Sequence, residues 1–210
     1  MWVDVVLVGL HARTLGRIHC PICISRREVG PAVEWADVFP LGPHVATMSE
    51  ESLAIRYADH DVVAELVDVI AYCAESVSRS FEGWDDPRSR GPGLYFVIVA
   101  GTSVADYADP MGANRWPVDQ CHVVEPGDGG FFEAANEVAF EADGAVIVSV
   151  DGVVMEQMVR LKDLSTEELE ALEVGQVEYR DWMGARHMSA VDTSLREEVV
   201  AAVTLSEEDG

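Results

Sequence analysis

Basic residues are scarce in this chain of 210 residues, in which 14 lysines and arginines stand against 38 aspartates and glutamates. Lys162 is the single lysine, and no basic cluster is longer than Arg26-Arg27. Direct binding of DNA or RNA needs a basic surface patch, so the composition argues against a nucleic-acid partner. An anionic ligand such as ATP would have to rely on a few arginines, a divalent metal and backbone amides.

The chain also lacks an apolar run of 18 residues, so no membrane span is expected. Residues 1–5 carry an early aspartate and no basic region, which argues against a secretory signal and predicts a cytoplasmic protein. Hydrophobic residues still make up 49% of the chain, although its formal net charge is −24. This combination is typical of a protein adapted to a salt-rich cytoplasm, where screening shortens electrostatic range to about 3 Å at 1 M salt.

Cysteine is another scarce residue, with four copies in the chain. Cys20 and Cys23 form a CxxC motif, whereas a zinc site usually shows a second such pair at a defined spacing. Because a second pair is missing, we interpret the cysteines as small apolar residues near a strand. The alternative is a partial metal or redox site, with His11 and His44 within reach.

The order of the expected elements predicts an α/β fold, because helices and strands alternate after about residue 50. We divide the chain into a small α/β extension at 1–50, whose role is unknown, and a main domain at 51–210. Residues 26–48 and 105–118 are expected to be irregular, with prolines and glycines in both. Strands are expected at 2–10, 18–25, 94–100, 121–124, 145–150, 153–161 and 199–205, and helices at 60–80, 131–141, 165–172 and 189–198.

An Asp-Gly pair, Asp143-Gly144, falls where a helix is expected to end and a strand to begin. Glycine permits close approach of the backbone to a ligand, and Ala145 leaves space beside it. An aspartate here could hold a metal or take a proton from a hydroxyl. The alternative is an ordinary turn, which we predict for the hairpin at Asp151-Gly152.

Arg186 and His187 follow a glycine just before an expected helix. The free N–H groups of a helix N-terminus favour phosphate, and arginine adds a fork that matches phosphate oxygens. Cations are disfavoured at that end of the helix dipole, so finding two there supports an anion between them. The alternative is a surface pair that offsets the acidic field.

The string Ser206-Glu207-Glu208 follows the last apolar strand. Carboxylates at the carboxyl end of a strand commonly line the crevice in which ligands bind. A solvated acidic turn in an already acidic protein is the simpler alternative.

Taken together and in this order, the three strings resemble the diadenylate cyclase domain family, whose members make cyclic di-AMP from two ATP. The resemblance covers about residues 55–210 and is carried by residues 142–146, 183–190 and 203–210. These segments are similar to the family's Asp-Gly-Ala motif, its Gly-Thr-Arg-His-Arg-like motif and its Ser-Glu-Glu-Thr-Gly-like turn. With its acidic surface, the chain resembles a haloarchaeal member of the family's archaeal branch.

The resemblance implies a mixed central β-sheet flanked by helices. It also implies a homo-oligomer whose active site forms where two domains meet face to face, each holding one ATP and one Mn²⁺ or Mg²⁺ ion. Asp143 would align the metal and the attacking 3′-hydroxyl, Arg186 and His187 would bind the triphosphate, and Glu208 would complete the metal contacts. The remaining residues implied to contact the nucleotide are Gly144, Ala145, Leu161, Gly184, Ser189, Ser206 and Glu207.

Three positions depart from the family's pattern. Ala142 stands where histidine is frequent, Ala185 replaces a threonine, and Met188 replaces the second arginine. A bound metal would have to neutralise more of the negative charge of the phosphates, so we expect an enzyme that is slow or needs much metal. The family's sheet also has a further strand beyond the Ser-Glu-Glu turn, whereas this sequence ends at Gly210, as expected of a shortened chain.

Two alternatives to an active cyclase stay open at this point. The lost hydroxyl and cation favour a catalytically weak or inactive homologue that binds ATP or cyclic di-AMP as a sensor. A purely structural reading would require Asp143, Arg186 and Glu208 to lie more than about 15 Å apart, beyond the reach of one bound ATP.

Overall fold

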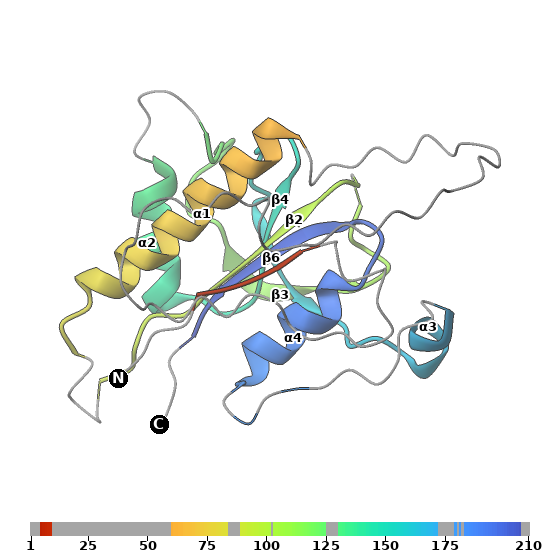
Figure 1. The fold of residues 1–210 in the computed structure, drawn as a ribbon. Helices are drawn as coiled ribbons and strands as arrows, with labels where there is room; N and C mark the ends of the chain where they lie inside the picture. The colour runs from red at the N-terminus through yellow and green to blue at the C-terminus, as the bar shows by residue number, and fades with distance from the viewer. Residues whose placement is uncertain are drawn as a thin grey trace, which may run out of the picture.

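Four strands form a mixed central sheet with helices on both faces (Figure 1). A computed structural model describes residues 5–9, 60–83, 89–101, 103–124, 130–171, 179, 181 and 183–206. The elements are β1 (Val5–Gly9), α1 (Asp61–Ser80), β2 (Leu94–Val99), β3 (Ala108–Arg115), α2 (Gly130–Glu141), β4 (Val146–Ser149), β5 (Gln157–Leu161), α3 (Thr166–Ala171), α4 (Ala185–Ser194) and β6 (Val199–Leu205). The α/β class and the mixed sheet expected from the sequence are therefore confirmed.

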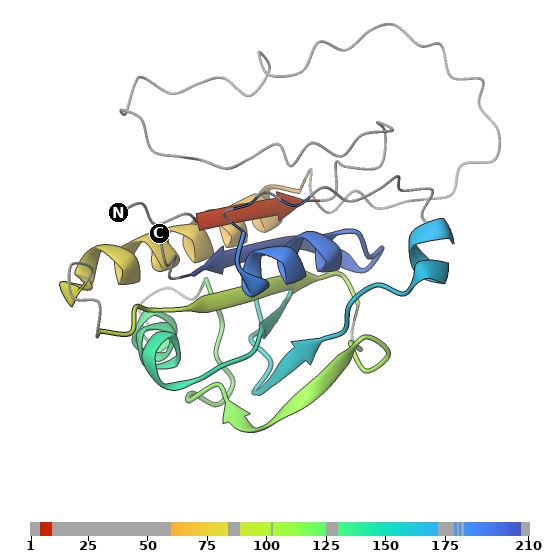
Figure 2. The ribbon, with the colours of Figure 1, turned by 90° about the horizontal axis from the view of Figure 1, so that it is seen from below.

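The strand order of the central sheet is β1-β6-β2-β4. β6 pairs antiparallel with both β1 and β2, and β2 pairs parallel with β4. β3 and β5 form a separate antiparallel pair that adjoins the β4 edge of the central sheet (Figure 2). Since β1 joins the sheet, residues 5–9 of the expected N-terminal block form one of its edges. The division into blocks at residue 50 stays a prediction.

β2 is buried along its whole length because its two faces pack into different halves of the core. Phe96 and Ile98 pack toward α1 and α2, where the Phe96 ring lies 5.7 Å from the ring of Phe131. Tyr95 and Val97 point to the opposite face, toward α4 and the β3–β5 pair. The two-residue period of a strand thus turns Tyr95 toward the face that carries the site.

α1 and α3 form where the sequence predicts helices. The apolar positions of α1 recur at three- and four-residue spacing and are buried against the sheet. The expected capping box of α3 is confirmed, because the Ser165 N–H donates to Glu168 Oε2 at 2.7 Å and the Glu168 N–H donates to Ser165 Oγ at 3.2 Å. The hydrogen bond from the Ser165 backbone, with help from Arg196, lowers the pKa of Glu168 to about 2.

The expectation of an irregular segment at 105–118 was wrong, because residues 108–115 form β3. Pro110 and Gly112 are poor strand residues, but β3 pairs with a single neighbour and tolerates them at an edge. The register shifts between Pro110 and Arg115, and Gly112 takes a φ of +61° in that interval. This segment forms a strand because it pairs with β5, which is distant in the sequence, so its local residues do not predict it.

The expected hairpin around Asp151-Gly152 is only partly correct. The turn is present, with Gly152 at φ +86° and its N–H donating to the Ser149 carbonyl at 2.8 Å. However, β4 joins the central sheet and β5 pairs with β3, so isolated bridges alone connect the two arms. β4 pairs with β2 and β5 pairs with β3, instead of β4 and β5 pairing with each other along their length.

Two further expectations meet different outcomes. Residues 121–124 contribute one bridge, between His122 and Val153, and not the strand that was predicted. The predicted strand at 18–25, the irregular segment at 26–48, and Cys20 and Cys23 with their neighbouring histidines lie outside the described residues. Within the described ranges, no helix combines the length and apolar character that a membrane crossing requires.

Candidate functional site

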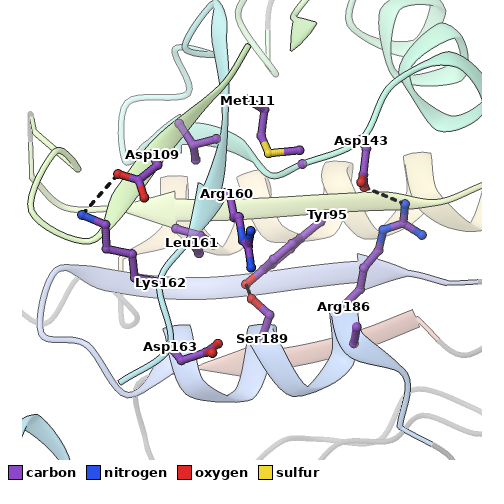
Figure 3. Close-up of a pocket in the computed structure, with 13 residues that line it drawn as sticks. Tyr95, Asp109, Met111, Asp143, Arg160, Leu161, Lys162, Asp163, Arg186 and Ser189 are labelled. Atoms are coloured by element: carbon purple, nitrogen blue, oxygen red, sulfur yellow. Dashed lines mark hydrogen bonds and ion pairs between the residues drawn. The ribbon is translucent and has the colours of Figure 1, made fainter. Parts of the chain in front are cut away.

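A cleft of about 650 Å³ lies between the start of α4, the β3–β5 pair and the segment that leads into β4 (Figure 3). Small-molecule sites in proteins span about 300–1,000 Å³, so the cleft is large enough for a ligand. Five residues that the sequence singled out line it: Asp143, Gly144, Leu161, Arg186 and Ser189. The fold thus brings the Asp143-Gly144 motif and the motif around Arg186 into one site.

Asp143 and Arg186 meet across the cleft although 43 residues separate them in the chain. Arg186 Nη2 donates to Asp143 Oδ1 at 3.1 Å, and Asn114 Nδ2 donates to the Asp143 carbonyl at 2.8 Å. The Asp143 side chain is 62% exposed and that of Arg186 is 26% exposed. Asn114 therefore fixes the Asp143 backbone, and the carboxylate, paired with Arg186, stays open to a ligand or an ion from the cleft.

Arg186 and His187 diverge because both lie within α4 and not ahead of it. The helix was expected at 189–198, but it begins at Ala185 and ends at Ser194. Successive residues of a helix project about 100° apart, so neighbours cannot share one face. Arg186 faces the cleft with Ala185 and Ser189, whereas His187 is fully buried and does not line the cleft. As placed, His187 does not reach a ligand in the cleft.

Gly184 and Ser206 lie close to His187, behind the start of α4. A Cβ built on Gly184 would be 3.9 Å from Ser206 Oγ and 4.0 Å from His187 Nδ1. Ser206 is buried, and neither it nor Gly184 lines the cleft. Glu207 and Glu208 lie outside the described residues, so their contacts stay predictions.

Gly144 occupies a position that only glycine takes without strain. Its φ is +102°, and a Cβ there would lie 2.9 Å from Met111 Cγ and 3.0 Å from the Val159 carbonyl oxygen. The adjacent Ala145 is buried and exchanges two backbone hydrogen bonds with Val159, at 2.7 and 3.0 Å. Gly144 thus lets the chain pass tightly beneath the cleft, and Ala145 packs behind the wall without lining it.

Gly144→Ala is expected to lower the free energy of unfolding by about 3 kcal/mol, because backbone strain is joined by a clash with a backbone oxygen. Gly112→Ala is the matched control, since Gly112 also has a positive φ but nothing lies within 4 Å of its Cβ position. That variant should lose only about 1–2 kcal/mol. Urea unfolding measures both, and equal losses would contradict the crowding at Gly144.

Several residues in or beside the cleft escaped the sequence analysis, among them Gly93 and Tyr95. A Cβ on Gly93 would lie 2.7 Å from Arg186 Cζ, so the guanidinium rests against the Gly93 backbone. Tyr95 lines the cleft from β2, and its hydroxyl donates to Thr193 Oγ1 at 3.1 Å, with Ser189 Oγ 3.5 Å away. Burial raises the pKa of Tyr95 to about 12, which keeps the phenol neutral. In the sequence, Gly93 belongs to no motif, and Tyr95 is an ordinary residue of an expected strand.

The cleft is much less acidic than the chain as a whole. Three of the seven described lysines and arginines line it, together with three aspartates, Asp109, Asp143 and Asp163. The cleft is thus balanced in formal charge, whereas the whole chain carries −24. The seven are Arg79, Arg90, Arg115, Arg160, Lys162, Arg186 and Arg196, of which Arg160, Lys162 and Arg186 line the cleft.

Among the residues that the structure describes, no three His, Cys, Asp or Glu side chains gather as a metal site. Mg²⁺ in nucleotide enzymes, however, is usually held by one or two carboxylates plus phosphates of the substrate. The exposed Asp143 carboxylate fits that smaller role. Asp143 could therefore contribute one carboxylate to an ion that a ligand's phosphates also hold.

Comparisons of the chain with protein-family models, curated proteins and solved structures find no match. The function is therefore inferred from the cleft itself and from the motifs that line it.

Proposed function

We propose that the protein is a diadenylate cyclase, which condenses two ATP into cyclic di-AMP and two pyrophosphates. The 3.1 Å contact between Arg186 and Asp143 carries this proposal, because it joins two of the three motifs on which the family resemblance rests. Leu161, the weaker candidate to cover the adenine, is part of the wall of the same cleft, with its side chain buried. The sequence also predicts a cytoplasmic protein, which fits a substrate found there.

The reaction needs a base or metal ligand near a hydroxyl and cations near a triphosphate. Each 3′-oxygen attacks the α-phosphorus of the other ATP, the new P–O bond forms, and pyrophosphate leaves with the electrons of the broken bond. In this reaction Asp143 would orient the 3′-hydroxyl or accept its proton, and Arg186 would bind phosphate oxygens; both line the cleft. Positioning and charge neutralisation supply most of the rate in such transfers.

The start of α4 adds backbone groups to the cationic side of the cleft. Ala185, the first residue of the helix, lines the cleft, and the N-cap Gly184 has no side chain to cap the first N–H groups. Phosphate oxygens bind well at such a helix end. When bound, Mn²⁺ or Mg²⁺ would be held by Asp143 and the phosphates and would neutralise part of the phosphate charge.

One cleft with one aspartate–arginine pair accounts for one ATP, so two facing subunits are needed to join two nucleotides. The rate per subunit should therefore rise with protein concentration. In the dilute range, where most chains are monomers, each tenfold increase should raise it by about tenfold, by mass action. Initial rates over a dilution series at saturating ATP and Mn²⁺ measure this. A rate per subunit that does not depend on concentration would contradict the two-subunit mechanism.

The direct test of the proposal is incubation of the full chain with ATP and Mn²⁺ or Mg²⁺, followed by chromatography for cyclic di-AMP and a pyrophosphate assay. Two pyrophosphates should appear for each cyclic di-AMP. GTP in place of ATP is the matched control for the nucleobase. If ATP is bound but neither product forms with either metal, the cyclase proposal fails.

A second candidate is a sensor that binds ATP or cyclic di-AMP without turnover. Two observations favour it: Arg186 is already paired with Asp143, and Met188 points away from the cleft, 36% exposed, at the position expected to carry a second arginine. Calorimetric binding of either nucleotide without release of pyrophosphate would support the sensor over the enzyme.

A further inference from the structure

Arg160 lines the cleft from β5, on a different wall from Arg186 (Figure 3). Residues 160 and 162 lie on one side of the strand, because Leu161 between them is buried and both neighbours are exposed. The β5 wall therefore presents two cations to the cleft. Neither belongs to the motifs that carry the family resemblance.

The two cations of β5 differ in what they contact. Lys162 Nζ lies 3.3 Å from Asp109 Oδ1 and donates to the Asp106 carbonyl at 3.3 Å. Asp109 is the cross-strand partner of Arg160 in register, yet its carboxylate pairs with Lys162. Across the described part of the chain, the structure gives the Arg160 guanidinium no ion-pair partner. Its five N–H donors are thus left for a ligand.

We propose that Arg160 is a second phosphate anchor of the cleft and takes the place of the arginine that is missing at Met188. This inference rests on the nucleotide-binding role proposed above. The ligand group is a polyphosphate chain, whose oxygens match the arginine fork. With Asp143, Asp109 and Asp163 also in the lining, Arg186 alone would not offset the charge of a triphosphate.

The geometry also explains why the cation comes from β5. Met188 lies two residues after Arg186 on α4, so the helical repeat turns it away from the cleft. A cation at that position would need a long reach back around the helix. Arg160 approaches the cleft from β5, so the phosphates would lie between Arg160 on one wall and Arg186 on the other.

Calorimetric titration of the full chain with inorganic tripolyphosphate, ATP and adenosine, each with Mn²⁺, tests the anchor. Arg160→Gln should weaken binding of tripolyphosphate and ATP by about tenfold or more and leave adenosine unchanged. Arg160→Lys keeps the charge without the fork and should lie between wild type and Arg160→Gln. The matched control is Arg115→Gln, which removes an exposed arginine of the same sheet that pairs with Glu156 outside the cleft.

Each outcome bears on Arg160 separately from the cyclase proposal. If Arg160→Gln loses tripolyphosphate binding while wild type makes no cyclic di-AMP, the anchor stands and the cyclase proposal falls. If Arg160→Gln binds both phosphate ligands as tightly as Arg115→Gln does, the anchor is overturned. Absence of binding of both ligands to wild type would overturn it as well.

Discussion

Asp143→Asn is expected to lower the rate of cyclic di-AMP formation by about 10²–10⁴-fold, the usual contribution of a positioned proton acceptor. Asparagine keeps the size of the side chain and an oxygen that can still accept from Arg186, so the fold and the 3.1 Å contact should survive. It removes the negative charge that would hold a metal and draw a proton. ATP binding should fall far less than the rate, since in the proposed complex the phosphates would be bound by the cations of the other walls.

The chain offers a matched control for this substitution in Asp151→Asn. Asp151 also precedes a glycine with positive φ, is exposed, and lies outside the cleft lining. Its carboxylate accepts a hydrogen bond from Ser149 Oγ, which asparagine can replace. Asp151→Asn should therefore retain activity. Equal rates for wild type and Asp143→Asn would remove Asp143 from the chemistry and with it the main support for a cyclase.

Gly93→Ala is expected to lower the cyclase rate by about 10²-fold, the loss that a displacement of about 1 Å can cause, with little loss of stability. The added Cβ would lie 2.7 Å from Arg186 Cζ, so the guanidinium must move away from its place beside Asp143. The atoms that meet the new methyl group are the far end of a flexible side chain, which can move at small energetic cost. Activity assays paired with thermal unfolding separate the two effects.

Gly101→Ala is the control for Gly93→Ala. Gly101 lies two residues after the end of β2, and the nearest atoms to its Cβ position are backbone atoms of Ser103 at 3.9 and 4.0 Å. It should leave the rate unchanged. In addition, Gly93→Ala should change little in an Arg186→Gln background, because both substitutions act on the same guanidinium. Full additivity of the two losses would show that Gly93 acts by another route.

Much of the fold was predictable because burial leaves a periodic trace in the sequence. The three- to four-residue spacing of α1 and the apolar runs of β2 and β6 identify these elements from local residues alone. The capping box of α3 is likewise a local contact, between Ser165 and Glu168. Such elements carry their signal within a few residues, and the structure confirms them.

The errors share a different cause, which is competition between distant partners. β3 contains Pro110 and Gly112 and becomes a strand because β5 pairs with it. The first turn of α4 was missed because Gly184 precedes it and it has no apolar repeat of its own, whereas the buried His187 packs that turn onto the core. In both places, tertiary contacts override a weak local preference.

The sequence by itself determined the α/β class, most of the elements, the scarcity of cations, and the glycine at 144 that a tight turn requires. Only the tertiary structure decided that Asp143 meets Arg186, that His187 turns inward, that Gly93 lies against Arg186, and that Arg160 lines the cleft. The physical reason is range. Dihedral preferences and burial periodicity act over a few residues, whereas a site depends on how separate elements pack and on which side chain each helical or strand repeat turns toward the shared space.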